Sequence, residues 1–305
     1  MCVKDIEPLR FTDYTKECCR IIAETGEYPT DQYLVTLVQM HSMTDRINRM
    51  LSCDEGEPLG ASLSAPLGMC IQLLEKELQA VKESIIPDTP QSSQSIMTTL
   101  ARHDPHELMT GTVFLLIHYH TLEIWLHEVA LHPHVPVSRY GSYTTTRLHI
   151  LYSCLTATTA FFKTFLTLPD VAYITMPYFY TAHFSHAILI LGKLLLFQDP
   201  AWDRQYVASV LDLPSIIETV ITKTEMNVQR EGIHHVPEIF KLLAPRLRVF
   251  KEFHVMRKAQ SENEMLGLGT GQIDDGLTNE RLQEMMEDLA LQFPEDASWQ
   301  DFMFG

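Results

Sequence analysis

Histidines and a glutamate recur at helical spacing in one segment, HYHTLEIWLHEVALHPH, residues 118–134. His120, Glu123 and His127 lie three and four residues apart, which places them on one face of a helix. Two imidazoles and a carboxylate could bind a metal ion there, or act as the acid and base groups of an enzyme. The structural alternative, which we favour, is that Glu123 accepts hydrogen bonds from one or both histidines in a helical core, where an unpaired polar group costs roughly 1 to 3 kcal/mol.

Motifs that would identify a particular chemistry are not found in the sequence. His127-Glu128 is followed by His132 five residues after His127, whereas a zinc protease needs its second histidine at the fourth position. No GxSxG elbow, Walker loop or GxGxxG motif stands between a strand and a helix, and GLGTG at residues 267–271 is part of a linker. We therefore expect no metal and no cofactor, and catalysis by the His120, Glu123 and His127 face is the alternative to a non-catalytic function.

Aromatic and histidine residues also gather at residues 173–186, and two further aromatic residues lie in the segment 118–134. Such side chains could line a pocket for a hydrophobic ligand, although core packing also explains them. The predicted ligand-binding residues are Tyr119, Trp125, Tyr178, Tyr180, His183 and His186, beside Tyr173, Phe179 and Phe184.

Composition and charge limit the class of protein. Of 305 residues 46% are apolar, which is enough for a substantial core. The 23 basic and 39 acidic residues give a net charge of −16, which opposes binding to DNA. The six cysteines form no CxxC pair, and the N-terminal residues show no signal or transit peptide. We expect an intracellular protein of the nucleus or cytoplasm that does not contact nucleic acid directly.

Helical periodicity dominates the chain, and no sustained alternation marks a sheet. We expect an all-α fold, a single large domain of about nine to eleven helices around nearly apolar central ones. In residues 67–86 the buried side is predicted to carry Leu73, Leu74, Leu78 and Val81. The predicted helices cover residues 13–25, 30–51, 67–86, 106–131, 144–168, 177–197, 202–227 with a break at Pro214, and 236–258 with a break at Pro245.

Residues 171–197 are long and apolar enough to be mistaken for a membrane span. They contain Pro177, His183, His186 and Lys193, however, which favours a buried helix, and we expect no membrane association. Residues 1–258 are predicted to form the helical domain, 259–278 a flexible linker and 279–305 an acidic amphipathic segment. Nine acidic residues and one basic residue from Asp274 onward are typical of a segment that docks on a partner or on its own domain.

Several segments together resemble one domain, the regulatory region of fungal zinc-cluster transcription factors. The similar segments are ECCRIIAETGEYPTDQYLVTLVQMHSMTDRI, the helix that ends at Pro87, HYHTLEIWLHEVALHP, PYFYTAHFSHAILILGKLLL and the closing DASWQDFMF. The head that defines this family, six cysteines beginning CxxC in a basic stretch, has no match here. The chain is then either a regulatory fragment of a longer activator or a chain whose lineage lost DNA binding.

The resemblance implies an all-helical effector region, often part of a dimeric regulator of metabolism, that senses a metabolite or contacts the transcription machinery. Our leading hypothesis is a regulatory domain that binds a hydrophobic small molecule in a closed apolar cavity, in control of fungal secondary metabolism. One alternative is an enzyme recruited from this scaffold, with an open pocket. The other is a module that dimerises or binds a partner protein without gripping DNA.

Overall fold

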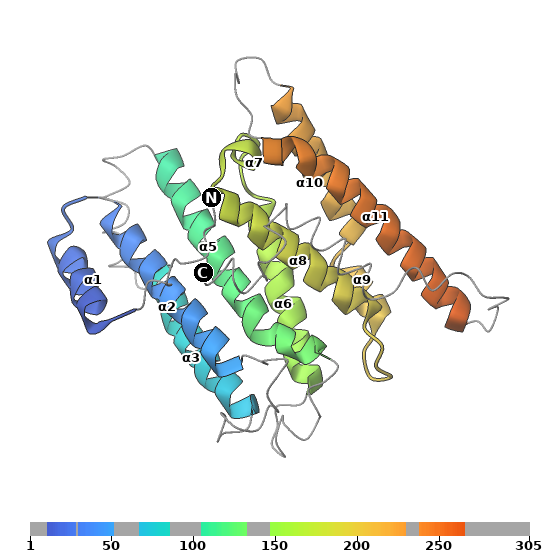
Figure 1. The fold of residues 1–305 in the computed structure, drawn as a ribbon, viewed down its shortest axis with the longest axis horizontal. Coiled ribbons are helices and arrows are strands. Elements are labelled where there is room, and N and C mark those ends of the chain that lie inside the picture. The colour runs from blue at the N-terminus through green and yellow to red at the C-terminus, as the bar shows by residue number, and fades with distance from the viewer. Residues whose placement is uncertain are drawn as a thin grey trace, which may run out of the picture. The chain divides into compact units, whose positions relative to one another are not determined.

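The computed structural model describes residues 11–28, 30–51, 67–85, 105–132, 147–229 and 238–265. Throughout this part of the chain the regular structure is helical and no strand occurs, which confirms the all-α class (Figure 1). The number of helices in the described residues falls within the expected nine to eleven. The described helices group into two compact units. One holds the described helices up to Thr164, and the other begins at Phe165.

The first unit is built around three helices that pack side by side, α2, α3 and α5 (Figure 1). Its elements are α1 (Asp13–Thr25), α2 (Asp31–Leu51), α3 (Leu67–Ile85), α5 (Pro105–His127), the 3-10 helix η1 (Glu128–Leu131) and α6 (Arg147–Phe165), whose last residue belongs to the second unit. The bounds of α1 are those predicted. Thr12 caps its first turn in a capping box, and Gly26 ends it in the left-handed conformation with φ of 53°.

The buried face of α3 carries two of the four residues predicted for it, and a third, Val81, is half-buried. Leu74 and Leu78 are buried as expected, but Leu73 is 46% exposed. The side of α3 that meets α2 and α5 instead carries residues at helical spacing toward the start of the helix, namely Leu67, Cys70 and Ile71. The spacing of three leucines and one valine therefore predicted the helix correctly, but it predicted only in part which side of the helix is buried.

The second unit contains α7 (Ala172–Thr175), α8 (Tyr178–Leu196), α9 (Arg204–Val210), α10 (Leu213–Val228) and α11 (Glu238–Met265). α10 packs along α11, and α9 packs on α8 (Figure 1). The chain breaks between α9 and α10, as predicted near Pro214, because Asp212 caps α10 and the proline occupies its first turn. The break predicted at Pro245 is wrong, since α11 continues through this residue.

α11 also ends later than predicted, at Met265, so the first residues of the range expected to be a linker are helical. A proline inside a helix removes one backbone hydrogen bond and crowds the preceding turn. Leu243, Ala244 and Leu247, which surround Pro245 in sequence, are buried. Packing of this apolar face supports the helix on both sides of the proline.

α8 is the helix that composition alone could assign to a membrane. Its window Phe179–Leu196 has a mean hydropathy of 1.3, and within the described residues it is the one helix that is both long and apolar enough. Of this window, 72% is buried inside the protein. The burial is that of a core helix, which is the interpretation that Pro177 and the two histidines favoured.

Candidate functional site

The helical face with His120, Glu123 and His127 packs against α3, and together they form a polar cluster inside the first unit. We call it the histidine–glutamate cluster. α5 contributes Tyr119, His120, Glu123 and His127, and α3 contributes Glu75 and Lys82. The two α3 residues were not predicted. They lie seven residues apart, so they share one face of α3, but this spacing does not say which helix that face meets.

Glu123 is the centre of this cluster. Its Oε2 accepts a hydrogen bond from His120 Nδ1 at 2.8 Å, and its Oε1 accepts one from the Tyr119 hydroxyl at 2.9 Å. Burial alone would raise the pKa of Glu123, but the hydrogen bond and charge of His120, the Tyr119 hydroxyl and the Lys82 ammonium together hold it below its usual value. The carboxylate is thus ionised and paired, with one of its two hydrogen bonds donated by a histidine.

His127 is oriented by two acceptors rather than by the Glu123 carboxylate. Its Nδ1 donates to the Glu123 backbone oxygen at 2.7 Å, and its Nε2 lies 2.9 Å from Glu75 Oε1. A carbonyl oxygen and an ionised carboxylate can only accept hydrogen bonds. Both ring nitrogens of His127 thus have a partner, and the contact with Glu75 links α3 to α5.

Lys82 and Tyr119 complete the pairing of charges in the cluster. The Lys82 ammonium lies 5.5 Å from the centre of the Tyr119 ring, a cation–π distance. Burial and the nearby Glu123 charge raise the pKa of Tyr119, so its hydroxyl stays protonated and donates. Each of the six side chains contacts at least one other member of the cluster, which is the pattern of a structural network.

The geometry does not match that expected for an open catalytic pocket. His120 and His127 are 7% and 6% exposed, whereas the enzyme hypothesis required both side chains to be accessible. The two rings also point to different carboxylates, Glu123 and Glu75. Among the described residues no group of three or more His, Cys, Asp and Glu side chains is placed to hold a metal ion.

Another histidine of α5, His118, lies on the opposite side of this helix from the cluster. It is 2% exposed, and its ring centre is 5.2 Å from that of His41 in α2. Burial and the nearby His41 lower the pKa of His118 to about 3. This ring therefore stays neutral at physiological pH and acts as a packing residue between α2 and α5.

The predicted ligand-binding residues are divided between the two units. Tyr119 and Trp125 are on α5, where Tyr119 is buried in the cluster and Trp125 is partly buried. On α8, Tyr180 and His183 are buried with their rings edge to face, and His186 is partly buried. The side chain of Tyr178 lies outside the described residues. The structure thus brings Tyr180 and His183 together in a packed aromatic group that also includes Phe179.

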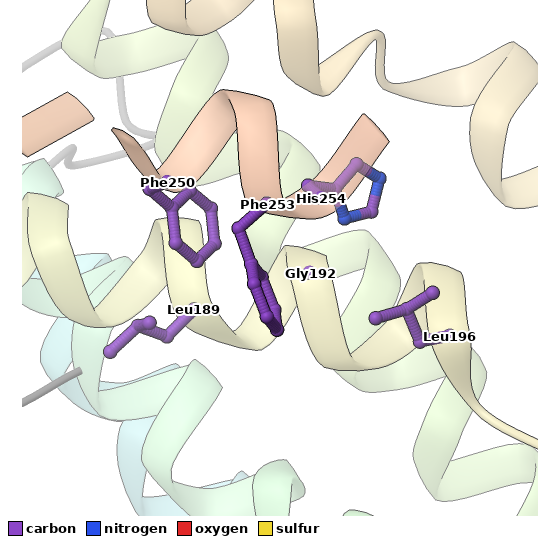
Figure 2. A pocket seen from close by; sticks show the side chains of 6 residues that line it. All are labelled: Leu189, Gly192, Leu196, Phe250, Phe253 and His254. Carbon is purple, nitrogen blue, oxygen red and sulfur yellow. The ribbon is translucent and has the colours of Figure 1, made fainter. Parts of the chain in front are cut away.

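A small pocket lies between α8 and α11 of the second unit (Figure 2). Its lining is apolar except for one histidine: Leu189, Gly192, Leu196, Phe250, Phe253 and His254. The two phenylalanines point from α11 toward α8, and the free volume between them is about 10 Å³. That is roughly the room of one water molecule, far below the roughly 300 Å³ or more of a typical ligand pocket. None of the predicted ligand-binding residues lines this pocket.

The sequence of the chain is similar to one protein-family model and to several fungal transcription factors. A family model described as a C-terminal domain matches residues 170–305, close to where the second unit begins. The transcription factor opdL of Penicillium oxalicum is 30% identical over 216 residues, 71% of this chain and 34% of opdL. A transcription factor of Aspergillus terreus is 21% identical over 260 residues, 81% of this chain and 40% of that protein.

A third relative, the transcription factor himD of Aspergillus japonicus, is 27% identical over 126 residues, 41% of this chain and 17% of himD. No solved structure is similar to the chain. The resemblance to the regulatory region of fungal transcription factors is therefore confirmed. The chain spans between a third and two fifths of the length of the first two relatives.

Proposed function

We propose that this chain is a regulatory domain of the fungal transcription-factor type that works by binding a partner protein or a hydrophobic small molecule and does not itself contact DNA. The observation that carries this proposal is the similarity to opdL over 71% of the chain. The proposed place of action is the nucleus or cytoplasm, in the control of secondary metabolism.

The charge of the chain supports a function without direct DNA contact. A net charge of −16 repels the phosphate backbone, whose binding depends on cationic side chains that displace counterions. At low ionic strength, where such attraction is strongest, fluorescence anisotropy of a labelled DNA duplex should not change when the protein is added. A rise in anisotropy that vanishes with added salt would contradict this part of the proposal.

Of the two binding modes, the described surface favours a partner protein. Large apolar side chains are exposed on helices of the first unit, among them Tyr14 (80%) and Ile21 (48%) on α1 and Met69 (61%) on α3. Tyr14 and Ile21 are seven residues apart and therefore share one face of α1. A hydrophobic small molecule, by contrast, would have to open the packed aromatic group of α8.

The two modes are separated by one experiment on the purified chain. Native mass spectrometry gives the mass of the intact assembly, and the denatured mass gives that of the chain alone. A mass excess of one small molecule per chain supports ligand binding, and a multiple of the chain mass supports self-association through the exposed apolar faces. A bare monomer that also fails to associate at high concentration and to copurify any protein partner would count against both modes.

A further inference from the structure

An apolar stripe is exposed along α11 in the second unit. Leu242, Val249 and Met256 are 45%, 56% and 55% exposed. They follow one another at intervals of seven residues, so they lie on one face of the helix. The opposite side of α11 carries Leu243, Leu247 and Phe250, which are buried. We call Leu242, Val249 and Met256 the α11 stripe.

Positive charge is concentrated around the α11 stripe in an otherwise acidic chain. Residues 241–258 contain six of the 23 basic residues and one acidic residue, Glu252. Two of the six are paired with α10, Arg248 with Glu225 and Lys251 with Glu218. The others include Arg246, which lies between Leu242 and Val249 on the same side of the helix.

Arg246 is a partly buried cation whose hydrogen-bonding capacity is incompletely used. Its Nη1 is buried and has no hydrogen-bond partner in the described part of the chain. A buried charged donor without an acceptor is costly, and a carboxylate is the acceptor that matches a guanidinium best. The surface around the stripe thus fits an occupant that is both apolar and acidic.

The C-terminal segment of the same chain has this chemistry. Residues 279–305 contain seven acidic residues and one basic residue. Apolar residues recur within it at helical spacing, at Leu282, Met285, Met286, Leu289 and Phe293. The family model that matches the chain from residue 170 continues through residue 305, so α11 and this segment belong to one matched domain.

We propose that the α11 stripe is the docking surface for the acidic C-terminal segment, residues 279–305, of the same chain. As a helix, Leu282 to Phe293 would be about 17 Å long and the stripe from Leu242 to Met256 is about 21 Å long, at about 1.5 Å per residue. The connection from Met265 to Leu282 spans on average roughly 22 Å as a flexible chain. Met256 lies about 14 Å back along α11, which is within this reach.

The docked arrangement pairs the apolar face of the segment with the stripe and its carboxylates with Arg246 and the neighbouring cations. It goes beyond the proposed function and does not depend on it, since it needs no ligand, partner or DNA. In this arrangement the chain's own acidic segment covers the apolar surface of α11. Both the stripe and the segment become accessible when the segment leaves α11.

Hydrogen exchange followed by mass spectrometry on the full chain tests this proposal. We expect the amides of residues 282–293 to exchange at least about tenfold more slowly than in an unstructured peptide. Val249→Glu combined with Met256→Glu should abolish this protection, because it places two carboxylates on the stripe. Met226→Glu, at a 64% exposed site of α10 in the same unit, is the matched control and should keep it.

A substitution in the segment, which leaves α11 unaltered, tests whether the loss of protection comes from lost docking and not from damage to α11. Leu289→Glu should abolish the protection in the same way, while exchange in α8, α10 and α11 outside the stripe stays unchanged. High salt should weaken the protection because it screens the paired charges. Unprotected amides in the unaltered chain, protection that survives both variants, or protection that is lost on dilution, which indicates a second copy, would each overturn the proposal.

Discussion

At the scale of single residues, the histidine–glutamate cluster shows how α5 carries polar groups in a nearly apolar setting. Glu123 receives two side-chain hydrogen bonds, and its backbone oxygen orients His127. His127 then reaches Glu75, which is 52 residues earlier in the chain. Each group offsets the desolvation of another, so removal of one member leaves a buried neighbour unpaired.

His127→Ala should lower the free energy of unfolding by about 2 kcal/mol, because it leaves a cavity and removes the link to Glu75. For a chain of this size we expect the thermal midpoint, followed by circular dichroism at 222 nm, to fall by several degrees. His149→Ala, at an exposed position of α6, is the control and should change the stability by no more than about 0.5 kcal/mol. Equal effects of the two substitutions would argue against a structural role of the His127 contacts.

The lowered pKa of Glu123 makes part of the stability dependent on pH. A carboxyl whose pKa is below its usual 4.5 in the folded chain stabilises the fold fully above that value and loses this contribution as the pH falls through the folded pKa. The unaltered chain should therefore exceed Glu123→Gln in stability near pH 6, and the difference should shrink below about pH 4.5. Urea unfolding of both proteins across this range measures it. A difference that grows toward low pH would have the wrong sign.

At the scale of elements, a glycine lies at two of the helix contacts, in different surroundings. A methyl group added at Gly192 of α8 would lie 3.2 Å from the Phe250 ring of α11, while one added at Gly111 of α5 would meet Tyr33 of α2 at an ordinary 3.8 Å. Phe250 is 4% exposed and has little room to move. The close approach of α8 and α11 thus requires glycine, and that of α2 and α5 does not.

These two sites predict opposite effects of the same substitution. Gly111→Ala should stabilise the chain by up to about 1 kcal/mol, because alanine loses less backbone entropy in a helix. Gly192→Ala should destabilise it by about 1 kcal/mol or more, because the added methyl overpacks the α8–α11 contact. Chemical denaturation of both variants measures the difference. The same sign at both sites would show that Phe250 yields to the methyl group.

At the scale of the whole molecule, the chain consists of two compact units, and the second has a core of its own. Phe165 packs edge to face on Tyr173 with ring centres 5.5 Å apart and stacks on Phe184 at 4.7 Å. The Tyr173 hydroxyl donates to the Phe165 backbone oxygen. The family model begins at residue 170, close to this boundary.

We therefore expect residues 165–305 to fold when they are expressed alone. The fragment should show a helical circular dichroism spectrum and a cooperative thermal transition, because its aromatic core is formed within the unit. Residues 1–164 serve as the companion fragment, and the two spectra together should approximate that of the full chain. A second-unit fragment without a cooperative transition would mean that its core needs the first unit.

The sequence by itself determined the features that depend on neighbouring residues. α1 has the predicted bounds, because the Thr12 cap and the Gly26 stop act within one turn of the helix. Asp212 and Pro214 separate α9 from α10 for the same reason. The all-α class followed from periodicity over many residues, and the spacing of His120 and Glu123 predicted their hydrogen bond.

Only the tertiary structure decided which surfaces meet. Glu75 could not be assigned to His127 from a sequence in which 52 residues separate them, because their contact depends on how α3 packs against α5. Leu73 is exposed although its spacing fits the apolar side of α3. α11 passes through Pro245 because burial of one face can outweigh a lost backbone hydrogen bond. In each case the deciding energy comes from contacts between distant segments, which local spacing does not contain.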